Sequence, residues 1–308
     1  MKVVIVGLPY FSKRLKNELT KFDPKNSYIN LDTYYSRKDK LRALIQIPRA
    51  DCVMSINGTV VGSKVFDLAF KHKVPLIINW AGTDVLKSLD AFRKGNFQQH
   101  YIDKAIHFCE AEWIQDELKE MNIHAEIVYF AISEGRVELK PVEAKEFTIL
   151  SYIPDRRTDF YGLPTLIRMA EKFPSIKFIV AGSDESVLAD LQSIPSNIKM
   201  LGWVDNMPEV FTQAHACMRF TEHDGLSNII REALSHGKQV LYKYSFHHCI
   251  PCPEEAILEE QISSLHQRFQ AGEDLMNNAG AEFIQETFKR EAILSNLVKK
   301  ITSAVEKK

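Results

Sequence analysis

Two acidic residues at a fixed spacing are the first feature of this sequence that could do chemistry. Asp224 and Glu232 stand eight positions apart in EHDGLSNIIREALSHG, residues 222–237. A strand-like segment at 215–220 precedes them and apolar residues at helical spacing follow, so the stretch predicts a strand-to-helix junction. The unpaired N–H groups of a first helical turn suit a phosphate, and Asp224 at the mouth could accept hydrogen bonds from hydroxyl groups. The plainer interpretation is that Asp224 complements the helix dipole and Glu232 is a surface acid.

The residues between the two acids have the properties of a binding loop. Gly225 allows the backbone to approach a ligand closely, and Ser227 can cap the following helix. A carboxylate such as Glu232 costs little in a helix when it is exposed and much when it is buried without a partner. Taken alone, the stretch leaves the structural and the chemical interpretations open.

Short apolar runs alternate with segments of helical period, which is the pattern of parallel strands joined by crossover helices. The pattern occurs twice, and the polar stretch 131–146 between the two series, with a proline and no apolar period, is typical of a linker. The predicted strands lie near 2–7, 27–31, 51–56, 74–79, 105–109, 125–129, 147–152, 176–181, 198–201, 215–220 and 238–242. The predicted helices lie near 12–22, 38–46, 61–72, 111–121, 162–173, 184–192, 206–213, 226–236 and 282–305.

The chain has a length of 308 residues, about right for two domains of roughly 150 residues each. We expect one domain at 1–135, a second at 146–282, and a closing C-terminal helix at 283–308. Doubly wound domains bind ligands at the carboxyl ends of their strands, so an active site is expected in a cleft between the two. A dinucleotide fingerprint does not follow the first strand, where Gly7 precedes Leu-Pro-Tyr, and this argues against a dehydrogenase.

The composition, with 45% hydrophobic and 26% charged residues, is that of a soluble globular protein. No run reaches the roughly 18 apolar residues of a membrane span, and the start of the chain has no signal-peptide core. We therefore expect a cytoplasmic protein. Its five cysteines form no dense framework, and we expect free thiols.

Charge is distributed unevenly along the chain. Residues 1–94 hold 17 Lys and Arg against 8 Asp and Glu, a net charge of +9, although the whole chain carries −1. Basic residues gather at 13–16 and at 37–42, where the second group opens a helix-like segment. They form either solvated faces or a surface that attracts an anionic membrane or a phosphorylated acceptor.

A longer match gives the two acids a chemical meaning. DGLSNIIREALSHGKQV, residues 224–240, resembles the acid-x7-Glu signature of retaining GT-B glycosyltransferases of family 4. Four further segments are similar to segments of that family and follow one another in the same order along the chain: 74–85, 105–132, 176–183 and 197–218. The resemblance implies an α/β fold of the GT-B type, with two doubly wound Rossmann-like domains that face each other across an interdomain cleft.

The resemblance also implies roles for individual residues. Asp224 would contact hydroxyls of a donor sugar and Glu232 the ribose of its nucleotide, while 202–204 would lie near the base. The full set of implied donor-binding residues is Arg156, Arg157, Tyr161, Gly202, Trp203, Val204, Asp224, Gly225, Leu226, Ser227, Asn228 and Glu232.

Two departures from the family pattern bear on activity. The family commonly places an Arg and, five positions on, a Lys-Gly against the diphosphate, but here Tyr161 takes the place of the lysine, so Arg156, with Arg157 as its alternate, must meet that charge. In WAGTDV, Ala81 stands where many relatives have a histidine. Asp84 is then the best first-domain candidate for acceptor orientation or proton acceptance, with a helix N-cap as the alternative role. The implied acceptor-side residues are Gly82, Thr83 and Asp84, and the catalytic candidates are Asp84 and Asp224.

A cluster of histidines and cysteines, HHCIPC at 247–252, has neither the second ligand pair of a zinc site nor the setting of a thioredoxin motif. We expect no metal and no cofactor. By resemblance this loop borders the donor site, so His247 or His248 could touch the sugar.

The sequence therefore predicts an enzyme that moves a sugar, with retention, from a nucleoside-diphosphate donor to a hydroxyl acceptor, in polysaccharide or glycoconjugate synthesis. The expected partners are the nucleotide sugar, a carbohydrate or lipid-linked acceptor and an anionic membrane in peripheral contact, without nucleic acid. The alternatives are a nucleotide-sugar 2-epimerase and a non-catalytic nucleotide-sugar-binding protein.

Overall fold

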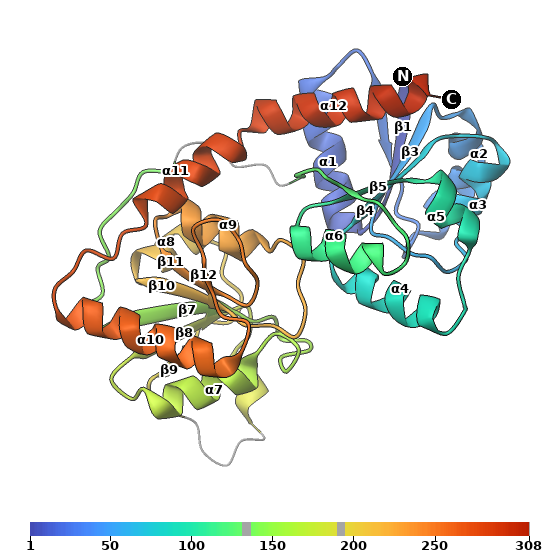
Figure 1. Ribbon diagram of the computed structural model, residues 1–308. Helices are drawn as coiled ribbons and strands as arrows, with labels where there is room; N and C mark the ends of the chain where they lie inside the picture. Colours follow the sequence, from blue (N-terminus) through green and yellow to red (C-terminus); the bar gives the residue numbers. More distant parts are fainter. Residues whose placement is uncertain (131–136, 190–194, 308) are drawn as a thin grey trace. The chain divides into compact units, whose positions relative to one another are not determined.

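A computed structural model describes residues 1–130, 137–189 and 195–307 of the chain (Figure 1). Contacts within the chain divide it into two compact units. The first domain comprises residues 1–132 and 288–308, and the second domain comprises residues 133–287.

The first domain is built on a six-stranded parallel sheet with the strand order β2-β1-β3-β4-β5-β6. Its strands are β1 (Lys2–Gly7), β2 (Ser27–Asn30), β3 (Cys52–Ile56), β4 (Leu76–Trp80), β5 (Ile106–Cys109) and β6 (Glu126–Ile127). Its helices are α1 (Pro9–Phe22), α2 (Arg37–Gln46), α3 (Lys64–Lys71), α4 (Thr83–Arg93), α5 (Gln99–Lys104), α6 (Glu112–Lys119) and α12 (Arg290–Glu306), with a 3-10 turn at Ile47–Arg49.

The second domain repeats this design with the strand order β12-β11-β10-β7-β8-β9, again parallel. Its strands are β7 (Thr148–Tyr152), β8 (Lys177–Ala181), β9 (Ile198–Met200), β10 (Ala216–Arg219), β11 (Gln239–Tyr242) and β12 (Ile250–Pro251). Its helices are α7 (Leu163–Lys172), α8 (Met207–Thr212), α9 (Asn228–Ser235), α10 (Glu255–Gln270) and α11 (Asn278–Thr287), with a 3-10 turn at Glu185–Leu188.

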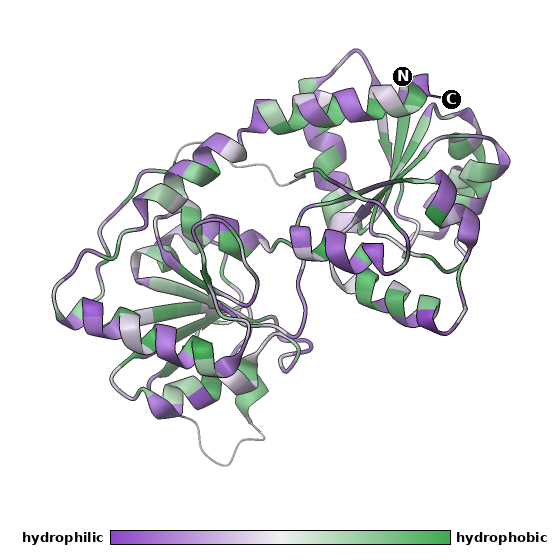
Figure 2. Cartoon of the chain, in the orientation of Figure 1, coloured by the Kyte–Doolittle hydropathy of each residue, from purple (hydrophilic) through white to green (hydrophobic). Residues whose placement is uncertain are grey.

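The central strands are apolar because they are covered on both faces. β3 and β4 are buried at every position, and Figure 2 shows both sheets mainly in green, with the hydrophilic residues on the outer faces of the helices. Parallel sheets need such double cover, so continuous Val, Ile and Leu runs predict them well. The central strands predicted from the sequence are confirmed to within two residues at each end.

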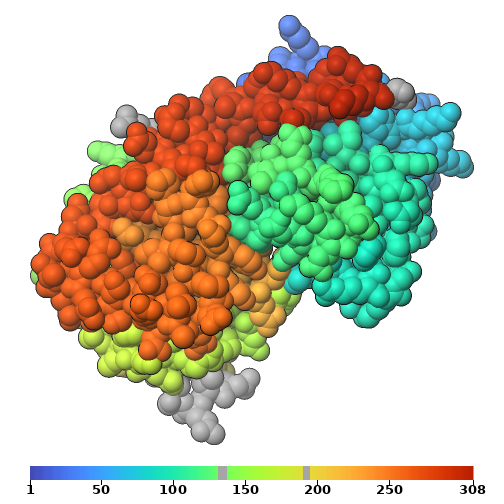
Figure 3. Space-filling model, viewed as in Figure 1, coloured from blue at the N-terminus to red at the C-terminus, as the bar shows by residue number. Residues whose placement is uncertain are grey.

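The helix expected at 282–305 is wrong as a single element, because the chain forms α11 and α12 with a break at Phe288 and Lys289. Phe288 is buried against the Tyr129 ring, 4.6 Å between centroids. The apolar period continues through the break because each helix buries one face. Periodicity alone does not show that α11 packs against α9 whereas α12 packs against α1 and β3. α12 packs against α1 and β3 and lies along the outside of the first domain (Figures 1 and 3), where Arg290 pairs with Glu18 at 2.6 Å.

Other expectations need smaller corrections. The helix expected at 184–192 is only a 3-10 turn at Glu185–Leu188 within the described residues, and 190–194 lie outside them. The expected linker at 131–146 lies outside the described residues as far as 136, and its remainder has no helix or strand. The sequence analysis missed four elements, α4, α5, α10 and β12.

Five free cysteines, Cys52, Cys109, Cys217, Cys249 and Cys252, confirm the expectation for the thiols. Over the ranges that the structure describes, no helix is both long enough and apolar enough to cross a membrane.

Candidate functional site

Each sheet has a point where the chain order reverses, between β7 and β10 in the second domain and between β1 and β3 in the first. Loops that leave neighbouring strands in opposite directions open a crevice at such a point, and ligands of doubly wound sheets bind there. The loops after β7 and β10 contain most of the donor-site residues that the sequence predicts. In the first domain, Asp84 follows β4 and contacts the loop after β3.

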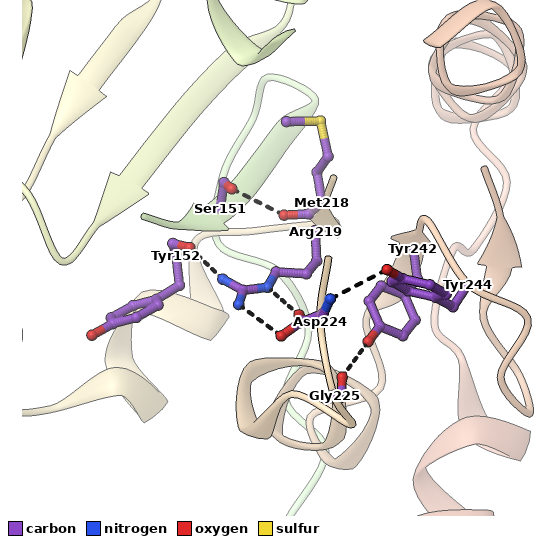
Figure 4. Close-up of polar contacts among 8 residues, drawn as sticks. All are labelled: Ser151, Tyr152, Met218, Arg219, Asp224, Gly225, Tyr242 and Tyr244. Carbon is purple, nitrogen blue, oxygen red and sulfur yellow. Dashed lines mark hydrogen bonds and ion pairs between the residues drawn. The ribbon is translucent and has the colours of Figure 1, made fainter. Parts of the chain in front are cut away.

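Asp224 lies in the turn between β10 and α9 and forms an ion pair with Arg219, the last residue of β10 (Figure 4). Nε of Arg219 donates to one carboxylate oxygen at 2.7 Å and Nη2 to the other at 3.3 Å. The side chains are only 6% and 14% exposed. Such a two-point contact fixes both the position and the plane of the Asp224 carboxylate.

Arg219 is held on its other sides by the neighbouring strand. Its Nη1 donates to the carbonyl oxygen of Tyr152 at 3.0 Å, and its guanidinium lies 5.0 Å from the centre of the Tyr161 ring. Burial opposes the charge, but the Asp224 carboxylate outweighs this and raises the pKa of Arg219. A charged guanidinium therefore lies at the switch point, beside Tyr161.

Two tyrosines fix the backbone of the same turn (Figure 4). The hydroxyl of Tyr242 donates to the carbonyl oxygen of Gly225 at 2.8 Å, and the N–H of Asp224 donates to the hydroxyl oxygen of Tyr244 at 3.2 Å. Gly225 is buried. The turn is thus tied to β11 and to the residues that follow it.

The remaining residues of the stretch surround the start of α9. Ser227 occupies the N-cap position, but its side chain makes no capping hydrogen bond, so the capping role expected from the sequence is wrong. Leu226 is buried, the carboxamide oxygen of Asn228 accepts a hydrogen bond from Arg231, and Glu232 is exposed in the second turn of the helix. Burial is the main cause of the raised pKa of Tyr152, and the negative charge of Glu232 adds to it.

The loop after β7 is joined to the loop after β10. The N–H of Glu222 donates to the carbonyl oxygen of Phe160 at 2.9 Å. Gly162 has φ +87°, and a Cβ there would lie 2.0 Å from the carbonyl oxygen of Phe220, so only glycine fits. The two loops therefore form one surface.

Both arginines named by the sequence lie on that surface and are exposed. The Arg157 guanidinium lies 3.9 Å from the centre of the Phe160 ring, and its φ of +63° is unusual for a residue with a side chain. Arg156 precedes it in the same loop, and which of the two meets a diphosphate stays a prediction.

The predicted base-binding segment follows β9. Gly202 is linked to the end of β8, because its N–H donates to the Ser183 carbonyl oxygen at 3.0 Å and its own carbonyl oxygen accepts from Gly182 at 2.8 Å. Trp203 is 75% exposed, and its indole N–H donates to Asp205 at 2.8 Å. Val204 is half-buried.

Two hydroxyls near the carboxyl ends of β8 and β10 are buried, and within the described residues neither has a hydrogen-bond partner. They belong to Ser183 and Thr221. Buried hydroxyls are normally hydrogen-bonded, and one that is not marks a place where a ligand or water can bind. Thr221 lies in the same loop as Asp224, and Ser183 lies in the loop after β8, where its carbonyl oxygen accepts from the N–H of Gly202.

In the first domain, Asp84 lies in the first turn of α4, whose N-cap is Gly82. Its carboxylate accepts from the backbone N–H groups of Gly58 at 2.5 Å, Gly82 at 2.8 Å and Ala81 at 3.1 and 3.2 Å. Burial raises the pKa of Asp84, while these N–H groups act in the opposite direction. Asp84 thus ties the loop after β3 to the loop after β4. Thr83, the first residue of α4, is half-buried.

The histidine and cysteine cluster forms part of the second-domain packing. The rings of His247 and His248 lie 4.9 and 5.3 Å from Phe283, and Cys252 is buried in the core. Among residues 1–130, 137–189 and 195–307, His, Cys, Asp and Glu side chains form no group of three or more that could hold a metal ion.

Arg219 is the site residue that the sequence analysis missed. Its signal was a charged residue at the end of the apolar run HACMRF, directly before a predicted loop. A buried strand carries a charge only if a partner compensates it, and Asp224 stands five positions on. The sequence thus predicts Asp224 as a site residue but not Arg219, which orients it.

Comparisons with known proteins place the fold. No family model matches the chain, and no curated protein sequence matches it. Solved structures match nearly its whole length. HepE from Anabaena, in complex with UDP and glucose, has 12% sequence identity and a TM-score of 0.73, covering 98% of this chain and 100% of its own.

Two further solved structures agree with it. A glycosyltransferase from Rickettsia africae has 12% identity and a TM-score of 0.71, covering 100% of this chain and 99% of its own. Sucrose-phosphate synthase from Thermosynechococcus elongatus has 12% identity and a TM-score of 0.71, covering 99% and 100%. The chain has the GT-B fold of these glycosyltransferases, as the sequence predicts.

Proposed function

We propose that the protein is a retaining glycosyltransferase that moves a sugar from a nucleoside-diphosphate donor to a hydroxyl acceptor. The observation that carries the proposal is the Arg219–Asp224 pair at the β7/β10 switch point, a charged site where this fold binds ligands. HepE was solved with UDP-glucose, and the pneumococcal O-GlcNAc transferase GtfA, at 13% identity, with UDP and GlcNAc. Uridine diphosphate sugars are therefore the first donors to test.

The proposed roles follow the sequence. Asp224 accepts hydrogen bonds from the sugar, Glu232 from the ribose, and Arg156 or Arg157 binds the diphosphate with the N–H groups at the start of α9. The acceptor hydroxyl attacks the anomeric carbon on the face that the leaving diphosphate vacates. Its proton passes to the leaving phosphate oxygen, so the step needs no protein nucleophile, metal or cofactor.

The first experiment separates this proposal from its two alternatives. The purified protein is incubated with a panel of UDP-sugars, and both free UDP and the donor sugar are followed. UDP release that rises with a carbohydrate or lipid-linked acceptor supports a transferase. Conversion of the donor to its 2-epimer, with no acceptor present, supports an epimerase, and tight donor binding without turnover supports a binding protein.

A second experiment tests the ribose role of Glu232. Glu232→Ala should weaken UDP binding roughly ten- to a hundredfold, because a charge-assisted hydrogen bond contributes about 1.5–3 kcal/mol. Glu171→Ala is the matched control, because Glu171 is an exposed acid of the same domain in α7. Titration calorimetry with UDP measures both. Equal affinities for the two variants would remove the ribose role.

We further propose that the transfer serves polysaccharide or glycoconjugate synthesis in the cytoplasm, at the inner face of a membrane. The basic bias of residues 1–94 supports this setting, because an acceptor linked to a lipid presents its sugar at an anionic surface.

A further inference from the structure

Helix α2 exposes an apolar stripe. Leu41, Leu44 and Ile45 are 67%, 59% and 53% exposed. Their spacing of three and four residues places them on one face of the helix. Ala43 is the residue of α2 that is buried. Large side chains this exposed, grouped on one face, mark a surface that meets something apolar.

Cations surround the stripe. Arg37, Lys38 and Lys40 are exposed in the first turn, and Arg42 follows. The one acid of the helix, Asp39, is already paired with Arg42 at 2.7 Å and accepts a hydrogen bond from the N–H of Asp32. The helix therefore carries a net positive charge beside its apolar stripe.

Exposed aromatic rings stand next to the helix. Tyr34 and Tyr35, in the loop that leads into α2, are 45% and 82% exposed, with ring centres 6.2 Å apart. Tyr10 and Phe11, at the start of α1, are 68% and 44% exposed. Because β1 and β2 are parallel neighbours, the segments that follow them start at the same edge of the sheet. Aromatic side chains of this kind suit the headgroup level of a bilayer.

We propose that α2, together with Tyr34 and Tyr35, docks the protein on an anionic membrane surface. Leu41, Leu44 and Ile45 enter the interface, and the flanking cations pair with lipid phosphates and carboxylates. A second copy of the chain fits less well, because a twofold contact through α2 would set its cations against the same cations of the other copy. The inference stands on the surface of the first domain and does not depend on the donor chemistry of the second.

Vesicle co-sedimentation tests the proposal. The full chain should bind vesicles of phosphatidylcholine with phosphatidylserine, and bind phosphatidylcholine alone at least tenfold more weakly. Arg37→Gln with Lys38→Gln and Lys40→Gln should weaken binding to the anionic vesicles about a hundredfold, at roughly fivefold for each cation near the surface. The matched control is Lys25→Gln with Lys71→Gln and Lys87→Gln, three exposed lysines elsewhere in the first domain, which should change binding less than threefold.

A second variant tests the apolar part. Leu41→Ser with Leu44→Ser and Ile45→Ser should lose at least tenfold in binding and leave residual attraction that salt removes. All three side chains are exposed, so the fold should persist, which circular dichroism checks. Equal binding of wild type and either test variant would overturn the proposal. A concentration-dependent dimer in sedimentation that this apolar variant abolishes would also overturn it and assign the face to self-association.

Discussion

Each parallel sheet has an aspartate near the carboxyl ends of its strands, Asp224 after β10 at the β7/β10 switch point and Asp84 after β4, but the two carboxylates are held differently. Asp224 is paired with the charged guanidinium of Arg219. Asp84 accepts hydrogen bonds from neutral backbone N–H groups of two loops. Asp224 is half-buried, whereas Asp84 is only 5% exposed.

The two environments suit the two carboxylates to different roles. Arg219 and Asp224 place two opposite charges at the carboxyl ends of β7 and β10, where ligands of doubly wound sheets bind. The Asp84 carboxylate instead accepts hydrogen bonds from the backbone N–H groups of two loops, and these bonds hold the loops in place. The second-domain aspartate is thus suited to a ligand, and the first-domain aspartate to positioning.

Arg219→Met is the variant that should disturb the comparison most. It leaves Asp224 partly buried without its cation, and breaking such a pair costs roughly 3–5 kcal/mol of unfolding free energy. Urea unfolding measures the loss. The control is Arg268→Met, whose pair with Glu273 has both side chains more than 40% exposed and should cost no more than about 1 kcal/mol.

A double-mutant cycle with Asp224→Asn isolates the pair. The double variant should lose clearly less stability than the two single losses combined, by about 1–3 kcal/mol, because the second change removes a charge that is already unpaired. Strictly additive losses would show that Arg219 and Asp224 act independently, and the contrast with Asp84 would disappear.

Asp84→Ala should have the next largest effect. It leaves the N–H groups of Gly58, Ala81 and Gly82 without their acceptor, at a cost of about 1–3 kcal/mol. Asp84→Asn keeps one oxygen and should cost less. Asp90→Ala, an exposed position of the same helix, is the control and should stay within about 0.5 kcal/mol.

Turnover of the Asp84 variants then separates positioning from proton transfer. If Asp84 only shapes its loops, Asp84→Asn should keep turnover within severalfold of wild type. If it accepts the acceptor's proton, as the sequence resemblance allows, both variants should lose about a hundredfold or more while Asp84→Asn stays stable.

The sequence predicts the position of Asp224 but not the groups that hold Asp224 and Asp84 in place. The strand-to-helix junction of Asp224 could be located, because apolar periodicity marks the strand and α9 on either side of it. Its partner left only a weaker signal, a charged residue in an apolar strand, because the spacing of Arg219 and Asp224 does not show that the two side chains meet across the turn. The backbone donors around Asp84 were invisible, since Gly58 lies 26 positions away and meets it only after the sheet has formed.

Each domain has a buried histidine in a similar environment, His107 in the first and His215 in the second. The Nδ1 atom of His107 accepts from the indole N–H of Trp80 at 3.1 Å, and Nδ1 of His215 accepts from the N–H of Thr148 at 3.2 Å. Burial lowers the pKa of each to about 4, with Lys238 adding to the effect at His215. Both are therefore neutral in the folded chain, and their stabilising contribution is fully present only above the unfolded pKa of about 6.5.

Stability should fall as the pH drops from about 6.5 towards 4, by at most about 1.4 kcal/mol per pH unit for each histidine, since the unfolded chain binds protons that the native rings cannot. His107→Gln and His215→Gln should each flatten this slope by a similar amount in urea unfolding at several pH values. His72→Gln, at an exposed position, is the control. A slope changed by only one of the two variants would show that the domains differ here as well.

Substituting either arginine of the loop after β7 should change stability least of all the test variants proposed. Both are exposed, so Arg156→Ala and Arg157→Ala should each change the unfolding free energy by no more than about 1 kcal/mol, with the larger change at Arg157 because its guanidinium lies on the Phe160 ring.

The effects of the two substitutions on UDP binding should rank in the opposite order. Arg157 gives up its ring contact to reach a diphosphate, whereas Arg156 has no such contact to lose, so Arg156→Ala should weaken UDP binding by the larger factor in calorimetry. A larger factor for Arg157→Ala would mean that the ring holds that guanidinium ready for the phosphates and would transfer the diphosphate role to Arg157.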